Sequence, residues 1–147
     1  MAGIIIVGVD GSDTAMKAAR TAAKLAASMG AELRVVTAHE SDATEVVEIG
    51  NDKWFIHESE RAEKVARDVA AELGAEGLRT SYTAVLGKPQ DALVAEAERV
   101  NARLIVVGNV GMQGLGRVLG SVASSVTHKA ACDVYIAKTA GTAGTAG

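Results

Sequence analysis

The chain has 147 residues, of which 48% are hydrophobic, 22% charged and only 3% aromatic. This composition is typical of one soluble, globular domain with an aliphatic, alanine-rich core. The formal net charge is -3 and there is no basic run, so binding to nucleic acid through phosphate neutralisation is not expected. No apolar run approaches the ~20 residues that a membrane span needs.

The single cysteine and the first residues bear on the cellular compartment. Cys132 has no second cysteine to pair with, which excludes an intrachain disulfide and favours a reducing environment. The first three residues lead straight into a strand pattern and leave no charged segment for a signal peptide. We therefore expect a cytoplasmic protein.

Strand and helix patterns alternate along the chain. Residues 4–9 form a β-branched run typical of a strand buried on both faces. An alanine-rich helix is predicted over residues 13–29, with Ser12 or Asp13 as its N-terminal cap and Gly30 at its end. Further strands are predicted at 33–38, 80–86, 104–107 and 134–137, and further helices at 62–73, 89–100 and 121–131.

This alternation predicts an α/β domain with one five-stranded parallel sheet, helices on both faces and right-handed crossovers. By analogy with doubly wound folds we expect the strand order 3-2-1-4-5, counting the predicted strands along the chain. The first and fourth strands are then neighbours where the winding reverses, and ligands bind outside such strand ends. Two glycine-marked loops, at residues 8–12 and 108–111, follow these strands.

Two segments fall outside this alternation. Residues 39–57 form a long polar insertion, expected to lack regular structure, with the only tryptophan and phenylalanine, Trp54 and Phe55. This insertion is interpreted as a lid over the crevice, a dimer contact or a mobile segment. The domain is expected to cover residues 1–138. Residues 139–147 repeat Thr-Ala-Gly, offer nothing to bury and are expected to be a disordered tail.

The segment 108–121 carries the clearest chemical signal. It reads GNVGMQGLGRVLGS, leaves a buried strand and enters a helix. Glycines allow positive φ and close approach to a ligand, and successive N–H groups in such a turn bind anions. The helix start at Gly120 and Ser121 adds unpaired N–H groups and a positive dipole end. The segment either holds phosphates, with Ser121 donating a hydroxyl, or makes a tight turn with Ser121 as a helix cap.

Several known sites are absent from the sequence. There is no G-x-x-x-x-G-K-[ST] phosphate loop, and no G-x-G-x-x-G follows the first strand. The acidic pair after the first strand resembles that of response-regulator receivers, but the third strand ends without a phosphoacceptor aspartate. His39, His57 and His128 lie on different elements, so no metal site is expected. No Ser-His-Asp or Cys-His arrangement indicates a catalytic residue.

Three motifs resemble those of the universal stress protein family: Val9-Asp10-Gly11-Ser12, Gly87-Lys88-Pro89, and Gly108…Gly111…Gly120-Ser121. The resemblance covers residues 3 to about 138. It implies a Rossmann-like fold of the adenine nucleotide α-hydrolase type, which is usually dimeric. One branch of the family, marked by G-x2-G-x9-G-[ST], binds ATP or related adenine nucleotides.

The resemblance also implies the ligand site, for an adenine nucleotide (ATP, AMP or cyclic AMP) with or without Mg. Between Gly111 and Gly120 this chain has eight residues where the family pattern has nine. The expectation is therefore adenine nucleotides in general rather than ATP in particular. Asp10, beside Gly11 and Ser12, would lie by the adenine or ribose, Ala38 would line the base, Gly108, Gly111, Gly120 and Ser121 would hold ribose and phosphates, and Met112 and Val122 complete the expected site.

The expected function is that of a nucleotide-binding regulatory protein of the stress response. A slow ATP hydrolase and a nucleotide-free, partner-binding dimer are the alternatives. The glycine loop argues against the nucleotide-free dimer. The missing phosphate-loop lysine and water-activating base argue against the hydrolase, although slow metal-assisted hydrolysis stays open. A homodimer is expected through residues 134–137, because the family pairs through this region and an uncovered apolar edge strand is a template for pairing.

Overall fold

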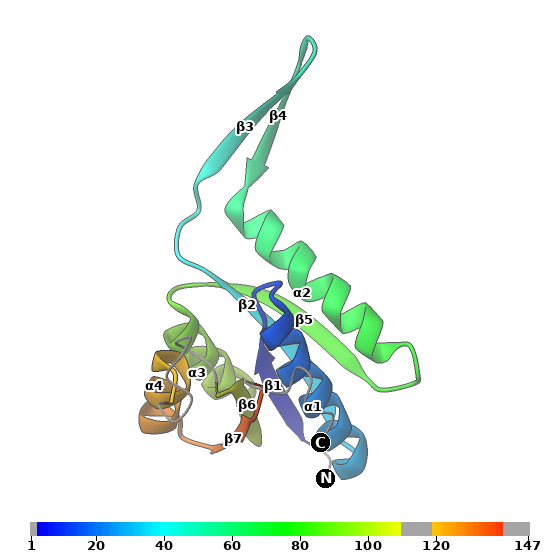
Figure 1. The fold of residues 1–147 in the computed structure, drawn as a ribbon, viewed down its shortest axis with the longest axis vertical. Coiled ribbons are helices and arrows are strands. Elements are labelled where there is room, and N and C mark those ends of the chain that lie inside the picture. Colours follow the sequence, from blue (N-terminus) through cyan, green and yellow to red (C-terminus); the bar gives the residue numbers. More distant parts are fainter. Residues whose placement is uncertain (1–2, 110–118, 140–147) are drawn as a thin grey trace.

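The computed structural model describes residues 3–109 and 119–139 (Figure 1). Its centre is a parallel sheet of five strands: β1 (Ile4–Gly8), β2 (Glu32–His39), β5 (Thr80–Leu86), β6 (Leu104–Gly108) and β7 (Asp133–Ala137). They lie in the order β5-β2-β1-β6-β7. Counted along the five predicted strands this is 3-2-1-4-5, so the expected α/β fold and strand order are confirmed.

Two pairs of helices cover the two faces of the sheet. α1 (Asp13–Met29) and α2 (Glu58–Gly74) pack on one face, and α3 (Pro89–Val100) and α4 (Ser121–Lys129) pack on the other. Successive side chains of a strand alternate between the faces. Ile5 therefore belongs to the core under α1 and α2, while Ile6 belongs to the core under α3 and α4, and both are fully buried.

Local sequence signals set the helix ends. Ser12 caps α1 by accepting a hydrogen bond from the Ala15 N–H at 3.2 Å, and Gly30 ends the helix in the left-handed conformation at φ 66°. Pro89 stands at the start of α3, where its missing N–H costs nothing. The predicted positions of these two helices are confirmed.

The insertion differs from the expectation. Residues 39–57 do not lack regular structure: β2 continues to His39, and β3 (Thr44–Ile49) pairs with β4 (Asp52–His57) in an antiparallel hairpin (Figure 1). The reason is local. Val, Ile, Trp and Phe flank the two-residue Gly50-Asn51 turn, and such residues favour strands around a tight turn. The many polar residues of the segment outweighed this strand pattern in the sequence-based prediction.

The end of the body also differs slightly. Thr139, expected in the tail, is 2% exposed, and its N–H donates to Oδ1 of Asn109 at 2.7 Å. Thr139 therefore packs with the body, one residue beyond the expected boundary, and the rest of the expected tail lies outside the described residues. Among the helices that the structure describes, none has the length and hydropathy that a membrane crossing requires.

Candidate functional site

A pocket lies at the carboxyl ends of β1 and β6. These strands are neighbours, with Val7 beside Val106, at the point where the sheet reverses its winding. This is the expected position for a ligand site. The pocket is lined by Gly8, Val9, Asp10, Ser12, Thr14, Ala15, Ala18, Val36, Ala38, Pro89, Leu93, Val107, Gly108, Val122 and Thr139.

The lining has an apolar side and a polar side. Val36 and Ala38 of β2, Leu93 of α3 and Val122 of α4 form an apolar wall. Asp10, Ser12 and Thr14 at the start of α1 form an exposed polar rim. No lysine or arginine is among the described lining residues. The pocket therefore suits a ligand that has a flat apolar part and a polar part.

The polar rim is built by the turn between β1 and α1. The Ser12 N–H donates to Oδ1 of Asp10 at 2.9 Å, and the Ser12 hydroxyl in turn caps α1. Gly11 adopts φ 87°, which only glycine accepts without strain. The turn thereby holds the exposed Asp10 carboxylate at the mouth of the pocket.

Two glycines at strand ends let other residues form the pocket floor. A Cβ on Gly8 would lie 3.0 Å from Cδ2 of Leu93, and a Cβ on Gly108 would lie 3.4 Å from Oγ1 of Thr139. The glycines thus allow Leu93 of α3 and Thr139 after β7 to approach β1 and β6 closely. This close approach places both Leu93 and Thr139 in the pocket lining.

Asn109 ties the two ends of the glycine loop together. Its N–H donates to the Ala137 carbonyl at 2.9 Å, and its own carbonyl accepts from the Gly120 N–H at 3.3 Å. Its side-chain Oδ1 accepts from the N–H of Thr139 at 2.7 Å and from the Thr139 hydroxyl at 3.3 Å. The loop therefore begins and ends at Asn109, which is anchored to Ala137 at the end of β7 and to Thr139 beyond it.

α4 begins at the far end of this loop. Gly120 is its N-cap, with φ -62° and ψ 156°, and no side chain caps the helix. Ser121 is the exposed first residue of the helix, so its hydroxyl is not used as the helix cap. The N–H groups of the first turn have no acceptor within the helix and carry its positive dipole end.

The predicted site residues fall into three groups. Asp10, Ser12, Ala38, Gly108 and Val122 line the pocket. Gly11, Gly120 and Ser121 are described but are not among its lining residues. Gly111 and Met112 lie outside the described residues.

Sequence reasoning missed three important residues of this region. Asn109 could have been noticed as a lone polar side chain between two glycines of the motif. Thr139 was hidden by its place in the repetitive tail. Leu93 had no signal beyond helical periodicity, since only packing against Gly8 makes it part of the floor.

Other candidates for chemistry have local structural roles. Nδ1 of His39 lies 3.0 Å from the Ser41 carbonyl, and Nδ1 of His57 lies 2.9 Å from the Thr44 hydroxyl. No group of three or more histidine, cysteine or acidic residues in the described chain is arranged to hold a metal ion. Burial raises the pKa of the half-buried Cys132 thiol, which disfavours the reactive thiolate.

Comparison with known proteins gives a consistent result. The profile of the Universal stress protein family matches residues 1–138. A universal stress protein of Mycobacterium tuberculosis is 34% identical over 143 residues, covering 92% of this chain and 95% of that protein. Another, of Thermus aquaticus, is 33% identical over 135 residues, covering 91% of this chain and 97% of that protein.

A solved structure agrees with these relatives. The crystal structure of a universal stress protein in complex with cyclic AMP superimposes with a TM-score of 0.70 at 34% identity, over 94% of this chain and 98% of that one. The match of the family profile to almost the whole described body shows that this chain belongs to the universal stress protein family.

Proposed function

We propose that this protein binds an adenine nucleotide in the pocket between β1 and β6, as a cytoplasmic regulatory protein of the stress response. The observation that carries the proposal is the pocket itself. It joins an apolar wall to a polar rim at the switch point of the sheet. The similar protein solved with cyclic AMP supports this class of ligand.

The apolar wall suits the base. Val36, Ala38 and Leu93 offer aliphatic surface on which a purine ring would lie. Asp10 stands at the rim with an exposed carboxylate, which accepts hydrogen bonds from ribose hydroxyls or an exocyclic amine. Because a carboxylate repels phosphates, the sugar rather than the phosphate is assigned to this side.

The glycine loop and the start of α4 suit the phosphates. With no basic side chain in the described lining, anion binding would rely on main-chain N–H groups and the helix dipole. Such a site favours a small phosphate charge. AMP or cyclic AMP is therefore expected to bind at least as tightly as ATP, and ATP would need Mg to offset its extra charge.

Calorimetric titration tests the proposal. ATP, ADP, AMP and cyclic AMP are titrated separately, with and without Mg, and thermal shifts are measured in parallel. We expect binding of at least one adenine nucleotide, with the monophosphates no weaker than ATP. The absence of both heat and thermal shift with all four at millimolar concentration would refute nucleotide binding.

The location of the site is tested by Gly120→Val. Gly120 has an extended backbone that valine also adopts, so the change adds bulk near the phosphates without backbone strain. We expect binding to be lost. Because Gly120 is buried, the added bulk also lowers the melting temperature, so affinity is compared in the folded protein. Unchanged affinity in a well-folded variant would place the phosphates elsewhere.

We also propose a homodimer through β7. This strand lies at one edge of the sheet and exposes Tyr135 at 43% and Ile136 at 38%. An uncovered edge with apolar side chains favours pairing with a second copy. Light scattering is expected to give a multiple of the 15.0 kDa chain mass. A concentration-independent mass equal to one chain would contradict the proposal.

A further inference from the structure

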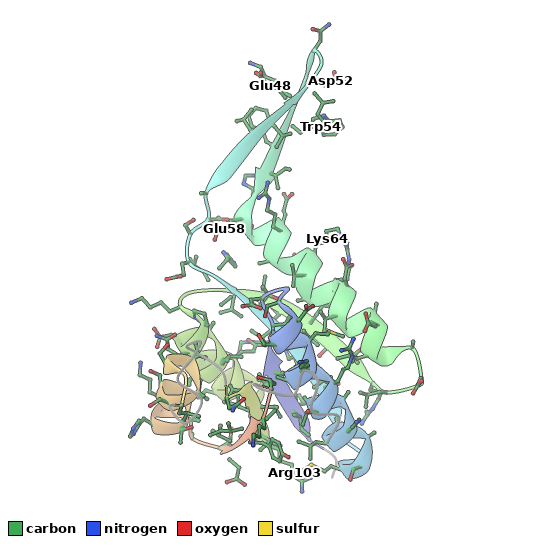
Figure 2. All side chains as sticks on the ribbon, in the orientation of Figure 1. Glu48, Asp52, Trp54, Glu58, Lys64 and Arg103 are labelled. Atoms are coloured by element: carbon green, nitrogen blue, oxygen red, sulfur yellow. The ribbon has the colours of Figure 1, made fainter. Side chains whose placement is uncertain are left out.

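The hairpin of β3 and β4 stands apart from the sheet and its helices. It rises beyond the start of α2 (Figure 1), and Figure 2 shows Trp54 on this arm, away from the body. Its base is fixed: the Glu58 N–H donates to the Ala43 carbonyl at 2.9 Å, and Thr44 contacts His57. The arm is therefore held at its base, and among the described residues no element outside the hairpin covers it along its length.

Large apolar side chains cover both faces of the arm. Directly paired residues of a hairpin share a face, and successive pairs alternate between faces. Val46 pairs with Phe55 on one face, and Val47 pairs with Trp54 on the other. Phe55 is 64% exposed, Trp54 57% and Ile49 65%. Because an isolated two-stranded hairpin is marginally stable in water, this arm is expected to pair with further strands in solution.

We propose that a second copy of this chain covers the arm, and that the two arms pair antiparallel through their β4 strands with Phe55 on the two-fold axis. The result is a four-stranded antiparallel sheet shared by two copies. This surface is distinct from the β7 edge, which lies in the central sheet.

The outer edge of β4 presents the required main-chain groups. β4 follows a two-residue loop, so the pair beside the loop is hydrogen-bonded and the pairs then alternate. By this alternation Lys53, Phe55 and His57 point their N–H and C=O groups away from β3. Antiparallel pairing of two such edges around a two-fold axis sets Phe55 opposite the same residue of the other copy.

The central pairs around Phe55 are apolar in this register, and Lys53 lies opposite His57 of the other copy at each end. Trp54 of each copy lies opposite Ile56 of the other, so apolar side chains meet on both faces of the new sheet. A register centred on Trp54 would instead set Asp52 opposite Ile56. Pairing through β3 would instead set the charged Glu48, which lies 3.8 Å from Nζ of Lys53, opposite Thr44 or Val46, neither of which carries a charge to match it. The observations therefore favour β4 over β3, and Phe55 as the centre.

Edge pairing gives each arm the further strands that a hairpin needs. A two-stranded hairpin is marginally stable in water, whereas three or more strands with an apolar face are stable. On β4, Trp54 is 57% exposed and Phe55 is 64% exposed. In the proposed register the unpaired main-chain groups of the two β4 strands and the facing flanks of these side chains cover one another, while Val46 and Ile49 stay on the outer strands.

An engineered cysteine tests the register. In the Phe55→Cys, Cys132→Ser chain, the two new thiols face each other across a hydrogen-bonded pair, whose Cα separation of about 5.5 Å suits a disulfide. We expect a covalent dimer after mild oxidation. Ile49→Cys in the same background is the control, because Ile49 lies on β3 at the outer side of the proposed sheet. No cross-link at position 55, or equal cross-linking at both positions, would overturn the proposal.

Substitutions of opposite charge at position 55 test whether Phe55 lies on the two-fold axis in solution. Phe55→Glu and Phe55→Lys each place like charges face to face, so each is expected to sediment at half the wild-type mass, while an equimolar mixture recovers it. Ile49→Glu should keep the wild-type mass. Trp54, the only tryptophan, should emit further to the red in the separated variants. Wild-type mass and emission in Phe55→Glu, or no recovery on mixing, would show that the arms do not pair this way.

Discussion

The two ends of the central sheet differ in how charged side chains are placed. At the carboxyl end, glycines and small side chains leave a pocket with a polar rim. At the amino end, charged side chains fill the space between the sheet and α3. One helix shows the contrast: Leu93 packs against Gly8 at the pocket, and one turn later Glu96 is only 5% exposed and binds Arg34.

The charges at the amino end satisfy one another. Arg34 donates through Nε to Oε2 of Glu96 at 2.6 Å and through Nη1 to the Ser81 hydroxyl at 3.0 Å. Ser81 donates to Oε2 of Glu32 at 2.7 Å, and Arg99 also donates to Glu96. The hydrogen bonds from Arg99 and Arg34 lower the pKa of Glu96 against the opposing effect of its burial. The ion pairs that stabilise the fold and the candidate ligand pocket therefore lie at opposite ends of the sheet. Substitutions at the amino end should change stability without changing ligand affinity.

The largest expected effect on stability is that of Glu96→Ala. It leaves the Arg34 guanidinium largely buried without its carboxylate, and breaking such a pair costs about 3–5 kcal/mol. Denaturant unfolding measures the loss. Nucleotide affinity of the folded fraction should not change, because Glu96 lies at the other end of the sheet. Glu98→Ala, an exposed neighbour on α3, is the control and should stay within about 0.5 kcal/mol of wild type. A loss of nucleotide affinity in Glu96→Ala would show that the two ends of the sheet do not act independently.

The next effect concerns the carboxyl end. Ser121→Ala removes the exposed hydroxyl at the start of α4, which the sequence motif predicts to donate to a phosphate oxygen. A hydrogen bond to a charged group contributes about 1.5–3 kcal/mol, so affinity should fall about tenfold or more. Titration measures the affinity, and unfolding measured alongside should show little change because this hydroxyl does not cap the helix. Equal affinities of variant and wild type would remove Ser121 from the site.

A smaller effect is expected for Thr139→Val. The variant loses the 3.3 Å hydrogen bond from the hydroxyl to Oδ1 of Asn109 but keeps the one from its N–H. Because Asn109 anchors both ends of the glycine loop, we expect about 1 kcal/mol of lost stability and a severalfold loss of affinity. Thr139→Ser keeps the hydroxyl and should therefore keep both the stability and the affinity close to wild type. If Thr139→Val changes neither, the contact to Asn109 has no influence on the loop.

The smallest and most specific effect is on the pH dependence of stability. Because the pKa of Glu96 is lowered from its usual value of 4.5, this group stabilises the fold above that pH and loses the contribution as pH falls through its folded-state pKa. Wild type should therefore lose stability more steeply than Glu96→Gln on acidification below pH 4.5. Melting temperatures measured from neutral to acidic pH check this. Parallel curves for the two proteins would contradict the role of Glu96.

The sequence by itself determined the strands of the central sheet and the helices between them along the chain, although not the hairpin of β3 and β4. The β-branched runs at 4–9 and 104–107, the cap at Ser12 and the left-handed Gly30 are signals read within a few residues, and each matches the structure. The glycine-marked loops likewise located the carboxyl end of the sheet as the candidate site. Such features depend on neighbours along the chain, which a sequence shows directly.

Only the tertiary structure decided the contacts between distant segments. Arg34 and Glu96 are 62 positions apart, and Thr139 reaches Asn109 across 30 positions. No local pattern marks these residues as partners, because their meeting depends on how α3 and the chain after β7 pack against the sheet. The exposure of Phe55 and Trp54 was likewise undecided until the hairpin was seen to stand off the body, since strand-forming residues specify pairing but not what covers them.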